Sequence, residues 1–201
     1  KADETMRALG YTEHSFAHVT KCAEVAARIL TQLGYTPKEV ELARIAAYMH
    51  DIGNVVNRHD HALSGATMAF RILDKMGMEP PDVAAVITAI GHHDDSTAYP
   101  VNAIAAALIL ADKTDVRRSR VRNKDMSTFD IHDRVNYSVE RSEVLLDLPG
   151  RTVTLSLSIN TEVCAVMDYF EIFLQRMLLS RKAAETLDLK FRLEINGQIL
   201  L

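Results

Sequence analysis

Residues 47–56 read AYMHDIGNVV, where an apolar helix runs directly into a histidine and an aspartate, His50 and Asp51. Burying an unpaired carboxylate costs free energy, so such groups shift their protonation, pair with an opposite charge or bind a metal ion. The preceding TPKE, residues 36–39, predicts the start of this helix, because it combines an N-cap threonine, a proline at the first helical position and a capping-box glutamate. Residues 42–49 are almost entirely apolar, which predicts a central buried helix that brings His50 and Asp51 to the edge of the core.

The length and composition restrict the class of protein. A chain of 201 residues suits one domain, or one domain with a smaller unit. The net charge of −4 argues against general nucleic-acid binding, which needs a basic face. Cys22 and Cys164 are too few for a disulfide framework and fit a reducing, cytoplasmic environment, although a single disulfide stays open. The longest apolar run, residues 103–111, is too short to cross a bilayer and no secretory signal opens the chain, so no membrane association is expected.

Residues 12–33 are expected to form a helix that ends at Gly34. Its spacing predicts two neighbouring apolar stripes. The first stripe contains Phe16, Val19, Ala23, Ala26 and Leu30. The second contains His18, Cys22, Val25 and Ile29, so that His18 shares a face with apolar residues.

Three further helices are expected from His61, from Pro81, and from Asn102 to Arg122. Each of them carries a histidine or an aspartate at an unusual place. These are His61 at a helix start, His92 and His93 at a helix end, and Asp112 after nine apolar residues. Neutral imidazole and carboxylate groups are ligands of divalent transition metals, so these positions together indicate a metal site.

The stretches HVTKCAEVA, HDIG, AIGHHD and LADKTD, with His61 between the second and third, follow one another in a fixed order along the chain. In this order they resemble the motifs of the HD-domain phosphohydrolase superfamily, which is named after its His-Asp doublet. The resemblance covers roughly the first 60% of the chain by motif spacing. The double histidine is most similar to the HD-GYP cyclic-dinucleotide phosphodiesterases, but the glutamate and glycines of that class are missing and Asn54 stands where it has a lysine.

The resemblance implies a set of metal ligands. A first ion would be bound by His18, His50, Asp51 and Asp112, with Asp51 bridging to a second ion that is completed by His61, His92 and His93. Other interpretations stay open for some of these residues. His50 and Asp51 could be an ordinary capped helix end, His59 competes with His61, and His92 could hydrogen-bond a carbonyl group, whereas His93 continues the apolar stripe of its helix.

Basic residues crowd the chain after Asp112. Lys113 and Arg117 are nearest to the expected metal and one helical turn apart, so we expect them to bind phosphate and to act in catalysis together with Asp51. The alternative is that these residues complement the negative end of a helix and face water.

The last third of the chain predicts a small sheet covered by a helix. Residues 152–159, TVTLSLSI, alternate as a half-buried strand does, and residues 137–146 are its expected hairpin partner. A helix capped by Thr161 should follow, and residues 187–195 should form a last strand with apolar odd positions. The expected apolar face of that helix is Val163, Met167, Phe170, Leu174 and Met177.

We therefore expect a mainly α fold, with an HD-type helical core over residues 1–125 and an appended small α+β (ββαβ-like) unit over residues 126–201 that serves dimerisation, regulation or as a lid. The expected function is a metal-dependent phosphohydrolase that cleaves a phosphate ester of a nucleotide or related small molecule through a metal-bound hydroxide. The cofactors would be two divalent transition-metal ions, Fe, Mn, Co, Ni or Zn in preference to Mg. The alternatives are a non-catalytic metal- or nucleotide-binding sensor and an oxygen-using di-iron enzyme. Apolar surface on the C-terminal unit also predicts a homo-oligomer.

Overall fold

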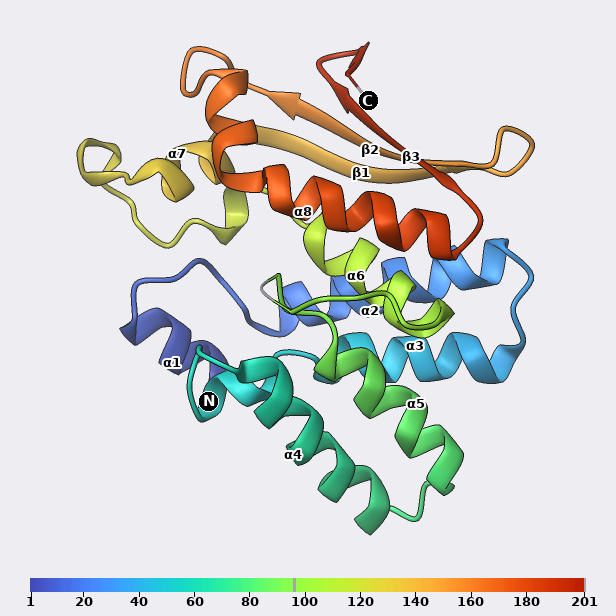
Figure 1. The fold of residues 1–201 in the computed structure, drawn as a ribbon. Helices are drawn as coiled ribbons and strands as arrows, with labels where there is room; N and C mark the ends of the chain where they lie inside the picture. The colour runs from blue at the N-terminus through green and yellow to red at the C-terminus, as the bar shows by residue number, and fades with distance from the viewer. Residues whose placement is uncertain (96, 201) are drawn as a thin grey trace.

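The computed structural model describes residues 1–95 and 97–200 and is mainly α-helical, with a small sheet at the C-terminal end (Figure 1). The first part of the chain forms α1 (Ala2–Ala8), α2 (Phe16–Gln32), α3 (Pro37–Met49), the 3-10 turn η1 (Ile52–Val55), α4 (His61–Lys75), α5 (Pro80–Gly91) and α6 (Ala103–Lys113). The second part forms η2 (Arg118–Arg120), η3 (Met126–Thr128), α7 (Ile131–Ser138), β1 (Val139–Asp147), β2 (Thr152–Ile159), α8 (Val166–Thr186), β3 (Lys190–Ile195) and β4 (Gln198–Ile199). The expected fold class, a helical core with an appended α+β unit, is confirmed.

The start of α3 has the local structure that its sequence predicts. The hydroxyl of Thr36 accepts a hydrogen bond from the backbone N–H of Glu39 at 3.3 Å, and the Glu39 carboxylate accepts one from the N–H of Thr36 at 2.9 Å. The start of α2 differs from the prediction, because Ser15 caps it and the helix begins at Phe16 instead of Thr12. Phe16 is also 74% exposed, so it does not belong to the buried stripe. The first turn of α2 projects beyond the core, and burial begins at His18.

The central helix of the fold is α6, not α3 as expected. Residues 104–111 are buried on every side, between α2, α3, α5 and α8. In α3, by contrast, one face is open and Tyr48 is 46% exposed. The prediction that this helix continues to Arg122 is also wrong, because α6 ends at Lys113 and the Thr114 hydroxyl bonds back to the carbonyl oxygen of Leu110 at 2.5 Å.

The sheet has the order β1-β2-β3-β4. β1 and β2 form the expected antiparallel hairpin, β2 and β3 are parallel, and β3 and β4 are antiparallel. β1 begins at Val139 instead of residue 137, because α7 continues to Ser138. The apolar odd residues from Leu187 to Ile195 are all buried, as predicted. Figure 1 shows α8 between this sheet and α6, so that α8 joins the two parts of the molecule.

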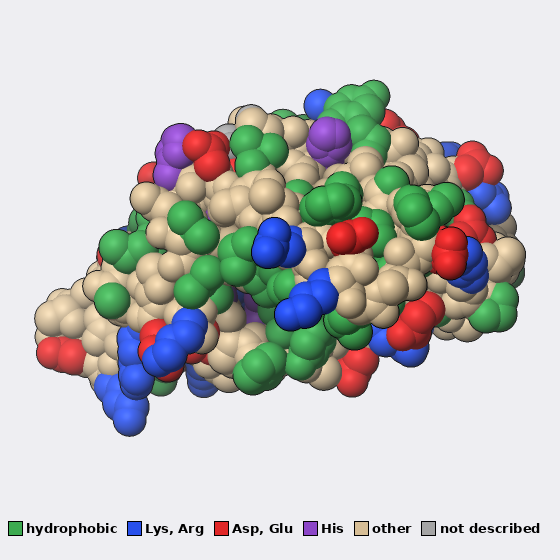
Figure 2. All heavy atoms as spheres, turned by 90° about the horizontal axis from the view of Figure 1, so that it is seen from below, with side chains coloured by type: hydrophobic (Ala, Val, Ile, Leu, Met, Phe, Trp, Pro, Cys, Tyr) green, Lys and Arg blue, Asp and Glu red, His purple; other side chains and the backbone are tan. Residues whose placement is uncertain are grey.

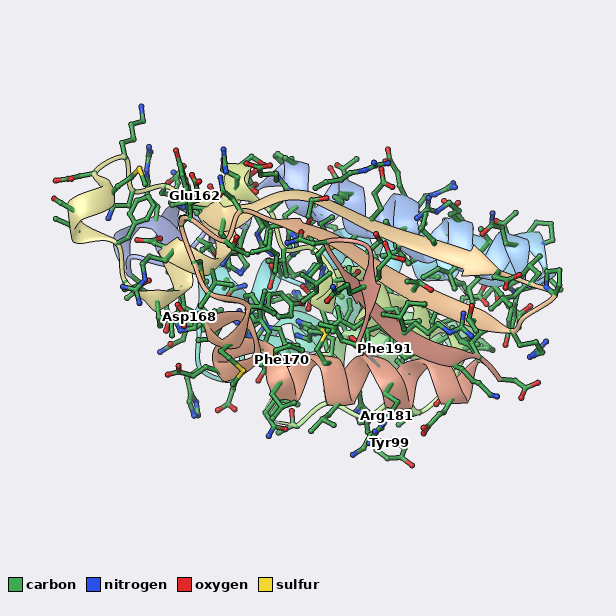
Figure 3. The ribbon with its side chains drawn as sticks, turned by 90° about the horizontal axis from the view of Figure 1, so that it is seen from above. Tyr99, Glu162, Asp168, Phe170, Arg181 and Phe191 are labelled. Atoms are coloured by element: carbon green, nitrogen blue, oxygen red, sulfur yellow. The ribbon has the colours of Figure 1, made fainter. Side chains whose placement is uncertain are left out.

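The apolar face of α8 differs from the prediction. The helix begins at Val166 after Ala165, so Thr161 is not its cap. Its buried line contains Tyr169, Phe173, Met177, Ser180 and Ala184, whereas Met167 is 73% and Leu174 47% exposed. Figure 3 shows Phe191 between β3 and α8, and Arg181 on the opposite side of the helix. The sequence of α8 carries apolar residues on two faces, and only the face toward the sheet and α6 is covered.

One continuous cluster of buried apolar side chains extends from α2 through α6 to α8 and the sheet. Cys22 and Cys164 are both buried free thiols, so the disulfide left open by the sequence is not formed. Within residues 1–95 and 97–200, no helix is long and apolar enough to cross a membrane.

Candidate metal centre

The predicted ligands lie where the ends of five helices meet. His18 is in the first turn of α2, and His50 and Asp51 directly follow α3. His61 is the first residue of α4, His93 lies two residues after α5, and Asp112 is in the last turn of α6. The side chains of His18, His50, His61 and His93 are buried almost completely. The centre therefore depends on the relative position of several helices rather than on one loop.

A first group of donor atoms surrounds a common point. Nε2 of His18 is 3.3 Å from Oδ1 of Asp112 and 3.7 Å from Oδ2 of Asp51. Nε2 of His50 is 3.4 Å from Oδ2 of Asp51 and 3.7 Å from Oδ1 of Asp112. Four tetrahedral donors bound to a metal at about 2.0–2.2 Å stand about 3.3–3.6 Å apart, so this spacing suits a small divalent ion.

A second group of donor atoms begins at the other oxygen of Asp51. Oδ1 of Asp51 is 3.6 Å from Nε2 of His61, and this Nε2 is 3.1 Å from Nε2 of His93. His50, Asp51 and His93 also offer donor atoms within 4.8 Å of one another, as do His18, His50 and Asp112. Asp51 is thus the residue that faces both groups, one carboxylate oxygen toward each.

Two buried polar atoms of this centre test whether the residues fit a metal ion. Within the described part of the chain, Nε2 of His50 and Oδ2 of Asp51 are buried without a hydrogen-bond partner. Leaving such atoms unsatisfied costs free energy, and native proteins rarely do so. A cation between the two atoms would remove this cost, so the donor set fits a metal ion.

The rings of three histidines are fixed by the backbone three residues earlier. Nδ1 of His50 lies 2.7 Å from the carbonyl oxygen of Ala47, and Nδ1 of His93 lies 2.6 Å from that of Ile90. Nδ1 of His61 contacts a backbone carbonyl oxygen in the same way at 3.0 Å. A carbonyl oxygen only accepts, so each Nδ1 carries the proton and each Nε2 keeps its lone pair for a ligand.

The environment of the second donor group favours the protonation states that bind a metal. Burial lowers the pKa of His93 to about 3, and burial together with the Arg58 guanidinium lowers the pKa of His61. Burial raises the pKa of Asp51, but the neighbouring imidazoles lower it by more, so the net shift is downward and the carboxylate is ionised. The second donor group therefore combines neutral imidazoles with an ionised carboxylate.

Gly53 of the HDIG stretch allows η1 to touch the start of α4. A Cβ atom at position 53 would lie 2.0 Å from the carbonyl oxygen of His61 and 2.6 Å from the backbone nitrogen of Gly65. No side chain fits at this distance. The close approach sets His61 beside Asp51, which explains why this position of the motif is a glycine.

The remaining predicted site residues lie at different distances from the two donor groups. Nζ of Lys113 is buried and lies 2.7 Å from Oδ2 of Asp112. Arg117 is not one helical turn beyond Lys113, because α6 has ended, and its guanidinium contacts Asp115 and Glu13 instead. His92 ends α5, is half-buried and belongs to neither donor group found among the described residues. The catalytic and ligand roles of these residues stay predictions.

Four residues that contact the centre carry no predicted role. Asp115 lies 2.8 Å from Nδ1 of His18, and Asn54 donates a hydrogen bond of 2.7 Å to Oδ1 of Asp51. Nη1 of Arg58 is 3.2 Å from Nε2 of His61. The ring of His14 meets that of His18 edge-on at 5.6 Å between centroids. A possible signal was the position of Asp115, three residues after Asp112 in LADKTD.

Seen from below, a histidine side chain is visible on the floor of a hollow whose rim carries hydrophobic and Lys or Arg side chains (Figure 2). One cationic group near the centre is Arg58, which is 27% exposed in its side chain and lies over the ring of Tyr11 at 5.7 Å.

The family model of the HD domain matches residues 15–135 of this chain. The match covers more than half of the sequence, includes every residue from His18 to Asp112 and ends within α7. No curated protein and no solved structure gives a significant match.

Proposed function

The chain belongs to the HD-domain family, the metal-dependent phosphohydrolase superfamily, and from this premise we propose that it hydrolyses a phosphate ester of a nucleotide or a related small molecule. The observation that carries the proposal is the position of Asp51. Its two carboxylate oxygens face different sets of histidines, which is the arrangement that two neighbouring metal ions need. Among the residues that the structure describes, Nε2 of His50 and Oδ2 of Asp51 are buried without a hydrogen-bond partner, which supports a cation in the first of these sets.

The residues that would hold the ions form two sets that share Asp51. The first set is His18, His50, Asp51 and Asp112, and the second is Asp51, His61 and His93. Imidazole-rich sets of this kind favour Fe, Mn, Co, Ni or Zn over Mg. Bound ions of this type polarise a phosphoryl oxygen and activate water as the nucleophile.

The protein's own residues hold the donors in place. Asn54 donates to Asp51 at Oδ1 and so fixes the rotation of the shared carboxylate. Lys113 binds Oδ2 of Asp112 and leaves Oδ1 directed toward His18 and His50. Side chains held in this way need no reordering when the substrate arrives, which is a main source of catalytic power.

Arg58 is the side chain that we assign to the phosphate group. Its guanidinium lies beside His61 and is partly exposed, so that it can contact a ligand bound at the candidate metal centre. Arg presents paired donors that match phosphate geometry. Tyr11, which is 46% exposed, lies under this guanidinium and offers a ring on which a nucleobase can stack. This pair supports a nucleotide-like substrate.

The experiment has two parts, the metal content of protein purified without added metal and turnover on a panel of nucleoside phosphates and cyclic nucleotides. Asp51→Asn removes the shared charged carboxylate with little change in shape. Asp60→Asn is the matched control, because Asp60 is an exposed carboxylate nine residues later. We expect wild type and Asp60→Asn to bind metal and to hydrolyse the same substrate, and Asp51→Asn to do neither. Full metal content without hydrolysis of any phosphate ester would favour the sensor function.

A further inference from the structure

We propose that Arg176 of α8 is a positioning residue for the metal centre, and that it acts through Asp95 and Lys113 on the outer oxygen of Asp112. The proposal rests on the metal-binding role of Asp112 proposed above. It assigns a function to the C-terminal unit, because it makes a residue of α8 part of the support of a metal ligand.

The four side chains form a row of alternating charges. Nε of Arg176 is 3.2 Å from Oδ2 of Asp95. Oδ1 of Asp95 is 3.0 Å from Nζ of Lys113, and the same Nζ is 2.7 Å from Oδ2 of Asp112. Each carboxylate therefore uses its two oxygens on two different partners. For Asp112, the second oxygen is the one that faces His18 and His50.

Lys113 determines how Asp112 can bind an ion. The Lys113 side chain is only 6% exposed, and a buried ammonium group is stable only when it is paired. The carboxylates of Asp112 and Asp95 both pair with this ammonium group. With Oδ2 held by this ammonium group, Asp112 offers Oδ1 alone. A one-oxygen ligand leaves an additional coordination position for water or substrate.

Asp95 needs Arg176 in order to hold Lys113. The Asp95 side chain is 35% exposed and lies between α5 and α6, outside any helix or strand. Water competes with Lys113 for a carboxylate that is this exposed, unless a second partner orients the carboxylate. Arg176 is itself held on α8, because its guanidinium lies 4.7 Å from the centre of the Phe173 ring, and Phe173 is buried. The row of charges thus begins at Arg176, which packs on the buried Phe173, and ends at Asp112, the proposed metal ligand.

The test is a Co²⁺ titration of the full chain after a chelator has removed bound metal. Affinity is measured by calorimetry, and the visible absorption of bound Co²⁺ reports the number and geometry of its ligands. The variants are Arg176→Ala, Arg176→Lys and Asp95→Ala, alone and in combination. Arg181→Ala is the matched control, because Arg181 is an exposed arginine of the same helix, directed away from the sheet (Figure 3).

We expect Arg176→Ala to weaken Co²⁺ binding about three- to tenfold and to change its absorption spectrum. Residues that bond directly to a ligand change metal affinity by about 10–100-fold, and Arg176 is two contacts further away. Arg176→Lys should restore most of the affinity, and Arg181→Ala should match wild type. Adding Arg176→Ala to Asp95→Ala should have almost no further effect, since both act through Lys113.

Several results would overturn the inference. If Arg176→Ala binds Co²⁺ as tightly as wild type with the same spectrum, the row does not position Asp112, even if the metal-free variant unfolds at a lower temperature. Additive losses from Asp95→Ala and Arg176→Ala would show that the two residues act separately. If wild type itself binds no Co²⁺, the proposed metal centre fails together with this inference, which distinguishes that outcome from the others.

Discussion

The carboxylate of Asp115 lies 2.8 Å from Nδ1 of His18, and both side chains are completely buried. Burial and the Arg120 charge lower the pKa of His18, but Cys22 and the carboxylates of Asp112 and Asp115 raise it by more, so the net shift is upward. His18 therefore differs from the other buried histidines of the candidate centre, whose Nδ1 atoms face backbone carbonyls. A carboxylate behind an imidazole makes the ring a stronger donor and fixes its orientation.

The first prediction follows from this contact. Asp115→Asn should weaken the binding of the first metal ion by about tenfold, because it keeps the shape but removes the charge behind His18. Asp115→Ala should weaken it further and lower the melting temperature, since Lys21, Arg117 and Arg120 lose their shared partner. The measurement is calorimetric titration of metal-stripped protein. Asp82→Asn, at a surface pair with Lys38, is the control, and equal affinities of Asp115→Asn and this control would refute the role.

The second prediction concerns Asp51. Asp51→Ala should reduce bound metal to less than one ion per chain and abolish hydrolysis, because both donor groups lose an oxygen. Without metal, the free energy of unfolding should fall by only about 1–3 kcal/mol. This is the cost of removing the carboxylate that accepts a hydrogen bond from the buried Asn54 amide. Metal analysis, thermal unfolding after chelation and turnover test these three effects together. Retained turnover would mean that Asp51 is not the shared ligand.

The third prediction is the number of metal ions. We expect two transition-metal ions per chain in wild type. Replacing both His61 and His93 by Ala should leave one ion, because these histidines belong only to the second donor group. Elemental analysis and native mass spectrometry give the stoichiometry, and His59→Ala is a control because its ring is exposed. A wild-type value of one that the double variant does not change would refute the second ion.

The fourth prediction concerns Arg58. Arg58→Met should lower kcat/KM by about 10–100-fold through the loss of a charge-assisted bond to phosphate. The second metal should bind at least as tightly, because a cation that now lies 3.2 Å from Nε2 of His61 is removed. Steady-state kinetics and metal titration separate the two effects. Unchanged kinetics in Arg58→Met, with metal bound, would assign phosphate recognition to other residues.

The fifth prediction is self-association. Met167 and Leu174 leave apolar surface on α8, two helical turns apart, and a second copy of the chain could cover it. Light scattering at micromolar concentration should show a dimer or larger oligomer, and Met167→Glu with Leu174→Glu should shift it toward the monomer. A wild-type monomer under these conditions would contradict the expectation.

Local contrast in the sequence marks most of the residues that the structure brings together at the candidate metal centre. A histidine or aspartate at the end of an apolar helix is visible without knowledge of the fold, and His50, Asp51 and Asp112 are all of this kind. The same contrast marks His93, which continues an apolar stripe and is buried as that stripe predicts. His92 has the same local signal, but it is the C-cap of α5 and is only half-buried. His92 and His93 can be distinguished only when the exact end of α5 is known.

The supporting residues could not be predicted in this way. Asp115 and His18 are 97 residues apart, and Arg176 and Asp95 are 81 residues apart. Nothing in either segment alone indicates the partner, because such pairs depend on how α6, α2 and α8 pack. The buried face of α8 was missed for a related reason. Helical spacing shows that an apolar face exists, but a helix with apolar residues on two sides gives no sign of which one the sheet will cover.

The complete burial of α6 has a consequence for how this protein is made. Residues 103–113, which form α6, are synthesised before α8. In the folded protein, α8 covers one side of α6. A nascent chain that has reached residue 135 contains the whole matched HD segment, yet one apolar side of α6 is still open to water. Such intermediates are prone to aggregation and are typical clients of chaperones. The segment from α8 onward therefore covers an apolar side of the preceding helices, and a chain that ends before α8 is expected to aggregate.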